Sequence, residues 1–150
     1  MDLGNRSGAP GKPTGSQLLG VLSAVLTAMR DSGGYPDVLT RICRALVETV
    51  PCDRSTVYVW SRRRKAFLPA ADHGTPAEVV QDFVRRGFGR GSFPGEDELR
   101  AGRAVFAVRG STTPELEDIL RLARLHALAV VPLFLHGRAE GTLSCGVDQP

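Results

Sequence analysis

The three histidines are the first side chains to consider for chemistry, because imidazole can bind a metal ion or move a proton near neutral pH. His73 follows Asp72 at the end of an expected strand, and His126 and His136 stand at the two ends of an apolar run. A strand of that length spans roughly 30 Å, so His126 and His136 could not share one metal ion. His73 beside Asp72 is the candidate ligand contact, and a surface turn histidine with an acidic neighbour is the alternative.

The three cysteines, Cys43, Cys52 and Cys145, are an odd number without a C-x-x-C pair. By themselves they predict neither a disulfide framework nor a structural zinc site. Cys43 lies next to the apolar face of an expected helix and Cys145 lies within an expected strand, positions that favour buried and inert thiols. No serine, histidine and acid arrangement and no pair of carboxylates stands out, so we expect no enzyme and no metal site.

Two glycine-rich or basic loops could touch phosphate. The loop Gly87–Gly91 lacks the Lys-Ser/Thr pair of a Walker motif, and we expect it to be a flexible pocket cover in which Phe88 and Phe93 make apolar contacts. Residues 62–65 form a basic run at an expected hairpin turn, which needs solvated residues in any case. A net charge of +3 without interleaved aromatic residues argues against nucleic-acid binding.

The length of 150 residues predicts one domain, and the 42% apolar and 23% charged residues are ordinary for a globular protein. No apolar run approaches the roughly 20 residues of a membrane span. The chain begins without an apolar core before Leu18, so we expect no signal peptide and a cytoplasmic location.

The N-terminal part predicts a tail followed by two helices. Residues 1–16 are rich in Gly, Pro, Ser and Asn and should be disordered. Apolar residues with helical spacing follow, at Leu18, Leu22, Val25 and Met29. This stripe either packs on the sheet or forms a homodimer seam. A second helix should run from about Pro36 to Pro51.

The strands come next, beginning with Ser55–Trp60, in which Thr56 and Tyr58 share one face. Residues 66–71 contain Pro69 and should form an edge strand, and residues 104–108 form a third. Residues 126–135 and 139–147 form a terminal hairpin. Its uncharged run Ala127–Leu135 predicts a central strand buried on both faces, in which Pro132 marks a bulge or a locally unpaired position.

Three shorter helices complete the pattern: residues 76–86, one turn over residues 96–101, and a helix capped by Thr113 with Pro114 in its first position. The resulting order of elements predicts an α+β fold with antiparallel hairpins at both ends.

Four short motifs accompany this order of elements: Cys52-Asp53-Arg54, Asp72-His73-Gly74, the segment Leu99–Val105, and Val131-Pro132-Leu133 followed by Gly137 and Gly141. Together, the order and the motifs resemble the GAF domain family of cytosolic sensor modules. The resemblance covers about Leu18 to Val147. It implies a central antiparallel sheet of about five or six strands, with N-terminal helices on one face. On the other face it implies a small-molecule pocket covered by short helices and loops, and it further implies dimers through terminal helices and a neighbouring output domain.

The chain also departs from the family pattern. We expect residues 17–150 to be a single GAF-like domain without the usual C-terminal helix and without an output domain in this chain. No cysteine is followed by histidine, which argues against bilin attachment, and residues 74–104 hold no cysteine, which argues against a GAF-type methionine sulfoxide reductase.

We therefore expect a GAF-type sensing domain that binds a small molecule non-covalently and regulates an output domain or partner. Its expected ligand-binding residues combine strand, turn and cover positions: Thr56, Tyr58, Asp72, His73, Phe83, Phe93, Ile119 and Leu120. The alternative is a structural or dimerisation module whose pocket is filled by its own side chains, such as Phe83, Phe88, Phe93 and Leu120. A haem or chromophore sensor and a reductase are the remaining alternatives, and the ligand and any cofactor stay unidentified.

Overall fold

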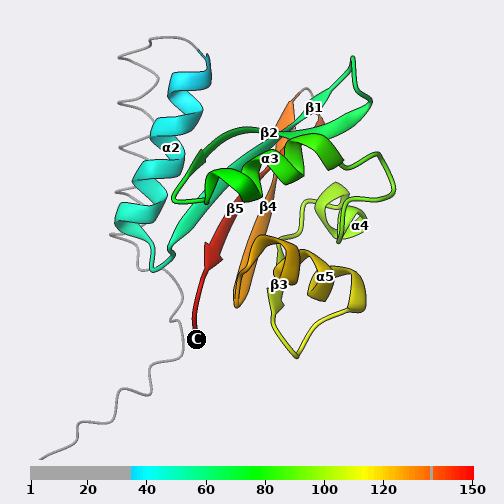
Figure 1. Ribbon diagram of the computed structural model, residues 1–150. Helices are drawn as coiled ribbons and strands as arrows, with labels where there is room; N and C mark the ends of the chain where they lie inside the picture. The colour runs from blue at the N-terminus through cyan, green and yellow to red at the C-terminus, as the bar shows by residue number, and fades with distance from the viewer. Residues whose placement is uncertain (1–34, 136) are drawn as a thin grey trace, which may run out of the picture.

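The computed structural model describes residues 35–135 and 137–150 (Figure 1). The predicted tail and the predicted stripe over residues 18–29 lie outside these residues. The described elements, in chain order, are α2 (Tyr35–Thr49), β1 (Arg54–Ser61), β2 (Ala66–His73), α3 (Ala77–Arg86), α4 (Glu96–Arg100), β3 (Val105–Val108), α5 (Pro114–Ala123), β4 (Ala127–Leu135) and β5 (Arg138–Val147).

The five strands form one antiparallel sheet in the order β2-β1-β5-β4-β3. This arrangement confirms the predicted α+β class. It also confirms β2 as an edge strand. Pro69 is tolerated there because one side of the strand has no neighbouring strand, and so no ladder of hydrogen bonds that a proline would interrupt. The register shifts between Val57 and Tyr58, so that Ala70 is the extra residue of a β-bulge in β2.

The prediction for β4 was wrong in one respect. β4 lies inside the sheet, but β5 is the central strand, and Val131 and Phe134 of β4 are 40% and 49% exposed. An uncharged run shows only that no charge must be solvated, and it does not require a cover over both faces. Pro132 lies two residues beyond Val130, the last β4 residue paired with β3, so it occupies a position where β4 has only one neighbouring strand.

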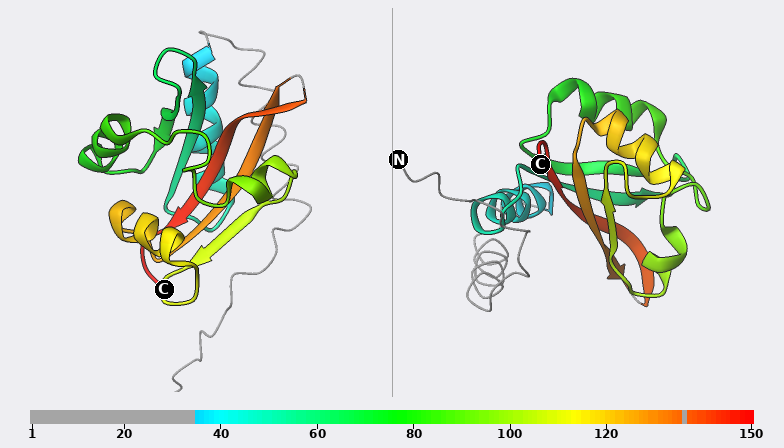
Figure 2. Two further views of the ribbon diagram at one scale, coloured as in Figure 1. Left: turned by 90° about the vertical axis from the view of Figure 1, so that its right-hand side faces the viewer. Right: turned by 90° about the horizontal axis from the view of Figure 1, so that it is seen from below.

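The sheet separates α2 from α3, α4 and α5 (Figure 2), and an apolar core lies on each of its faces. On one face, α2 packs on β1 and β2, and Leu39 and Cys43 of α2 meet Val57 and Ala71 of the strands. On the other face, α3, α4 and α5 cover a larger core. The alternation predicted for β1 is confirmed, because Val57 faces α2 whereas Tyr58 packs against the larger core.

One arginine and one threonine fix the ends of two covering helices. The Thr113 side chain accepts a hydrogen bond from the Leu116 amide and caps α5, as predicted. Arg64, in the basic turn between β1 and β2, donates to the carbonyl oxygens of Val84 (2.6 Å) and Arg85 (3.1 Å) at the end of α3. The basic turn therefore has a structural role, since it satisfies carbonyl groups that a helix end leaves without a partner.

Two motif glycines are required by close backbone approach. A Cβ at Gly141 would lie 2.6 Å from the carbonyl oxygen of Tyr58, where β5 passes β1. Gly74 has φ +83° and a Cβ there would lie 2.4 Å from the carbonyl oxygen of Asp53. Among the described residues, no helix combines the length and the apolar character that a membrane span needs.

Candidate functional site: a covered cavity

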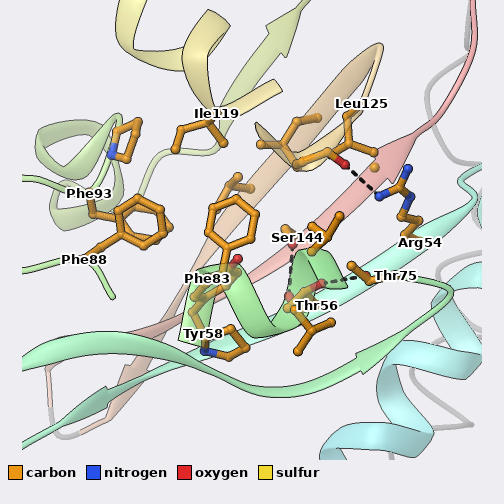
Figure 3. A pocket seen from close by; sticks show the side chains of 18 of the residues that line it. Arg54, Thr56, Tyr58, Thr75, Phe83, Phe88, Phe93, Ile119, Leu125 and Ser144 are labelled. Atoms are coloured by element: carbon orange, nitrogen blue, oxygen red, sulfur yellow. Dashed lines mark hydrogen bonds between the residues drawn. The ribbon is translucent and has the colours of Figure 1, made fainter. Parts of the chain in front are cut away.

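A cavity of about 70 Å³ lies between the sheet and the covering segments (Figure 3). At about 10–15 Å³ for each water, that volume holds roughly five water molecules. Its walls come from strands β1, β2, β4 and β5, from helices α3 and α5, and from the segment 87–95. The lining residues are Arg54, Thr56, Tyr58, Pro69, Thr75, Val79, Val80, Phe83, Phe88, Phe93, Pro94, Leu116, Ile119, Ala123, Leu125, Leu128, Val130, Ser144 and Gly146.

One end of the cavity is polar. The hydroxyl groups of Thr56 and Thr75 lie 3.3 Å apart, and the Ser144 hydroxyl donates to the backbone carbonyl of Thr56 at 3.1 Å (Figure 3). β1 and β5 present Thr56 and Ser144 as directly opposed residues of the ladder, which places both on the same face of the sheet. These hydroxyl groups can accept or donate hydrogen bonds to a bound molecule.

Arg54 closes this polar end. Its side chain is buried, and the guanidinium donates to the carbonyl oxygens of Ala123 (2.7 Å) and Arg124 (3.0 Å) at the end of α5. Its Nε also forms an ion pair with Asp148. Because these partners neutralise and orient the guanidinium, Arg54 forms a fixed part of the wall.

The other end is aromatic. Tyr58 packs edge-on against Phe83, Phe88 and Phe93, with ring centroids 6.2, 6.1 and 5.9 Å away. Phe67 extends the group, at 5.6 Å from Phe93. Burial, with a smaller contribution from Asp72, raises the pKa of the Tyr58 phenol well above its ordinary value. Tyr58 therefore presents a neutral hydroxyl to the cavity at any physiological pH.

The segment 87–95 covers the aromatic end and is held by specific contacts. Phe88 and Phe67 exchange two backbone hydrogen bonds of 2.7 and 3.1 Å. The Arg90 guanidinium lies 4.2 Å from the centroid of the Trp60 ring and 3.8 Å from a Glu140 carboxylate oxygen. These contacts attach the cover to β1, β2 and β5. Because Phe88 is buried in the larger core, opening the cover would expose apolar surface of that core.

The structure places five of the eight predicted site residues in the cavity wall: Thr56, Tyr58, Phe83, Phe93 and Ile119. Asp72 lies opposite Thr56 on the edge strand but does not reach the wall. His73 lies opposite Ser55, and the pair faces α2, so this imidazole is on the other side of the sheet from the cavity. Leu120 is fully buried in the core beneath the wall.

Sequence reasoning missed three polar residues of the wall, Arg54, Thr75 and Ser144. Strand alternation could have found Ser144, because it shares a face with Thr142 and Gly146 in β5. Arg54 could have been recognised from the sequence as a charge at the start of an apolar strand, because a buried guanidinium there needs polar partners. Thr75 follows the glycine turn after β2, and no sequence signal indicates that its hydroxyl turns back toward Thr56. In the described part of the chain, no three metal-binding side chains gather in a way that could hold an ion.

Comparison with known proteins gives one family. The model of the GAF domain matches residues 35–150. No curated protein sequence matches this chain. Among solved structures, the GAF domain of an Acinetobacter phosphoenolpyruvate-protein phosphotransferase superposes with a TM-score of 0.69 at 15% identity, covering 91% of this chain and 80% of the other.

Two further solved structures show the breadth of proteins that share this fold. The free methionine-R-sulfoxide reductase of Neisseria meningitidis has a TM-score of 0.67 at 17% identity, covering 92% of this chain and 78% of the reductase. A domain of a two-component sensor histidine kinase protein of Sinorhizobium meliloti has a TM-score of 0.58 at 19% identity, covering 79% of this chain and 76% of the other. Identities this low show a common fold and no more.

Proposed function

Because this chain belongs to the GAF domain family, whose members are regulatory or sensing modules, we propose that it binds a small molecule non-covalently in the covered cavity and thereby regulates an output domain or partner. The observation that carries the proposal is the cavity itself. It combines apolar walls with a few convergent hydroxyl groups at one end, which is the composition of a ligand site.

The walls define the chemical class of ligand. A compact and largely apolar molecule suits the Phe83 and Phe93 end, and one or two hydrogen-bonding groups suit the hydroxyls of Thr56, Thr75 and Ser144. An anion has less to gain, because the Arg54 charge is already paired with Asp148. A ligand larger than the present volume would have to displace the cover over residues 87–95.

The signal has a direct route out of the cavity. Arg54 touches the last turn of α5 at Ala123 and, through Asp148, the residue that follows β5. Binding that shifts α5 would therefore move the C-terminal end of the sheet. Such coupling requires the ligand to bind the shifted state more tightly than the resting one.

A structural or dimerisation module is the second candidate function, and the aromatic cluster favours it. Tyr58, Phe83, Phe88 and Phe93 fill much of the covered space, and the remaining 70 Å³ is well below the roughly 300–1,000 Å³ of drug-sized ligand pockets. In that case dimer formation through terminal helices, and not ligand binding, would be the function.

We propose that the domain is not an enzyme and acts in the cytoplasm. A reductase with this fold exists, yet none of the described residues lining the cavity is a cysteine. A haem, flavin or bilin group would appear directly in the absorbance spectrum of the purified chain.

A thermal-shift screen of small, mostly apolar compounds tests the proposal. A compound that raises the melting temperature should lose roughly fivefold in affinity for Thr75→Val, which removes one hydroxyl from the wall. His73→Ala is the matched control, because His73 lies on the other face of the sheet. The affinity of the compound for this variant should equal its affinity for the unmodified chain. Equal binding to Thr75→Val and the unmodified chain, with weaker binding to His73→Ala, would refute this site.

A further inference from the structure

Three arginines from three different segments surround an open hollow of about 330 Å³ beside the β4–β5 hairpin. Arg90 comes from the cover, Arg100 is the last residue of α4, and Arg138 is the first residue of β5. The other lining residues belong to the hairpin and are Phe134, Gly137 and Ala139. This arginine hollow is separate from the cavity, because the two share no described lining residue.

Most hydrogen-bond donors of these arginines are unused within the described part of the chain. Each guanidinium carries five N–H donors. Arg100 donates to a Glu96 carboxylate oxygen at 2.7 Å, and the Arg138 guanidinium contacts no acceptor among the described residues. Arg90 lies 3.8 Å from a Glu140 carboxylate oxygen, a distance too long for a hydrogen bond. None of the described lining residues is acidic, so the hollow presents three cations to an entering molecule.

Arg90 is held in place by contacts that leave its donors free. Its guanidinium lies over the Trp60 ring, 4.2 Å from the centroid, and 5.8 Å from the centroid of the Phe67 ring. Stacking on an aromatic ring uses the flat face of a guanidinium, whereas an anion is bound by its N–H edge. The Arg90 side chain is therefore pre-organised to donate two parallel hydrogen bonds to an anion.

A buried hydroxyl next to the hollow also lacks a partner. Thr142 of β5 is 4% exposed, and its hydroxyl has no hydrogen-bond partner among the described residues. The side chain lines a space of about 10 Å³, enough for roughly one oxygen atom the size of a water molecule. Three residues, Arg90, Arg100 and Ala139, line both this space and the arginine hollow. The Thr142 hydroxyl can therefore donate to an oxygen of a molecule bound at the hollow.

From these groups we propose that the arginine hollow binds a small organic phosphate monoester. A phosphate monoester has three acceptor oxygens and a charge of about −1.5 to −2 at pH 7, so each of the three guanidinium groups can donate to one oxygen. A carboxylate has only two oxygens and one charge, and it suits three cations less well. Phe134 is 49% exposed and gives the organic part of the ester an apolar surface.

Phosphate binding at this site would also hold the cover in place. Arg90 belongs to the cover over residues 87–95, and Arg138 belongs to β5. One phosphate bonded to both arginines would add a link between the cover and the sheet. The site does not depend on a ligand in the cavity, but its occupation would make opening of the cover less frequent.

Titration of the full isotope-labelled chain with phenyl phosphate, followed by NMR and calorimetry at low ionic strength, tests the proposal. We expect saturable binding that moves the amide signals of residues 137–139 and 90–100 and that weakens as salt is added. Inorganic phosphate should bind more weakly, because it has no organic part to contact Phe134. Amide exchange over residues 87–95 should slow several-fold when phenyl phosphate is bound.

Two variants assign the binding to named groups. Arg138→Gln should weaken phenyl phosphate binding about tenfold, because it removes a charge-assisted hydrogen bond. Arg62→Gln is the matched control, since it removes the same charge from the exposed turn between β1 and β2, and its affinity for phenyl phosphate should equal that of the unmodified chain. Thr142→Val keeps the shape of the side chain and should weaken binding about fivefold, because the hydroxyl is lost.

Four results would overturn the proposal. The first is an absence of saturable binding, and the second is equal affinity of Arg138→Gln and Arg62→Gln for phenyl phosphate. The third is equal affinity of the unmodified chain for inorganic phosphate and phenyl phosphate. The fourth is a set of signal changes centred on Thr56 and Ser144, which would place phenyl phosphate in the cavity and leave the arginine hollow without a role.

Discussion

The Arg54 guanidinium donates from Nη1 to the carbonyl oxygen of Ala123 at 2.7 Å, and so joins the first residue of β1 to the last residue of α5. The arginine thereby supplies a cation at a helix C-terminus, where the carbonyl groups lack partners and the helix dipole is negative. Its ion pair with Asp148 extends the same connection to the residue that follows β5. One buried side chain thus links the polar end of the cavity to two elements that could report binding.

Replacing this arginine should destabilise the domain strongly. Arg54→Met keeps a long apolar stem but leaves the carbonyl groups of Ala123 and Arg124 and the Asp148 carboxylate without their cation, at a cost of about 3 kcal/mol in the free energy of unfolding. Urea denaturation measures this change. The control is Arg85→Ala, which removes an exposed pair with Asp82 and should cost less than about 1 kcal/mol. Equal effects of the two substitutions would show that Arg54 is not a structural link.

The cover should loosen when its cation–π contact is removed. Arg90→Ala deletes the guanidinium that lies over the Trp60 ring, a contact worth about 1 kcal/mol at a partly exposed site. We expect amide exchange over residues 87–95 to accelerate several-fold, including the Phe88 amide that bonds to Phe67, while global stability changes little. Arg62→Ala, at the exposed turn, is the control. Unchanged exchange in Arg90→Ala would mean that the rings alone hold the cover.

Cys43 should make the fold sensitive to alkaline pH. Its pKa is raised from 9.0 to about 11 by burial, so the folded state resists ionisation that the unfolded chain undergoes. The stability is therefore complete below about pH 9 and is lost as the pH rises toward 11, by up to about 3 kcal/mol. Urea denaturation across this range should show a shallower decline for Cys43→Ala than for the unmodified chain. Parallel curves would mean that the Cys43 thiol is not protected from ionisation.

Local periodicity was sufficient to predict most of the described elements. Strand alternation placed Thr56 and Tyr58 on one face of β1, and helical spacing placed Phe83 on the covered face, because each pattern depends only on near neighbours in the chain. The Thr113 cap was readable for the same reason.

Other features depend on pairings between distant residues. His73 is at the end of β2 that points toward the cavity, but its pairing with Ser55 directs its side chain to the α2 face. A shift of one residue in this register would have directed the side chain to the cavity face. The role of Arg54 depends on Ala123 and Asp148, far away in the chain.

The central claim is that the covered cavity takes up a small molecule, and native mass spectrometry tests it most directly. The unmodified chain and Ala123→Leu, whose larger side chain would fill the 70 Å³ space, are each incubated with the small-molecule fraction of the expressing cells. Circular dichroism first confirms that Ala123→Leu is folded, because overpacking can cost about 1–3 kcal/mol. We predict a bound mass on the unmodified chain and none on Ala123→Leu. If both proteins carry no added mass, or carry the same one, the cavity is not a ligand site and the self-filled structural module is the better account.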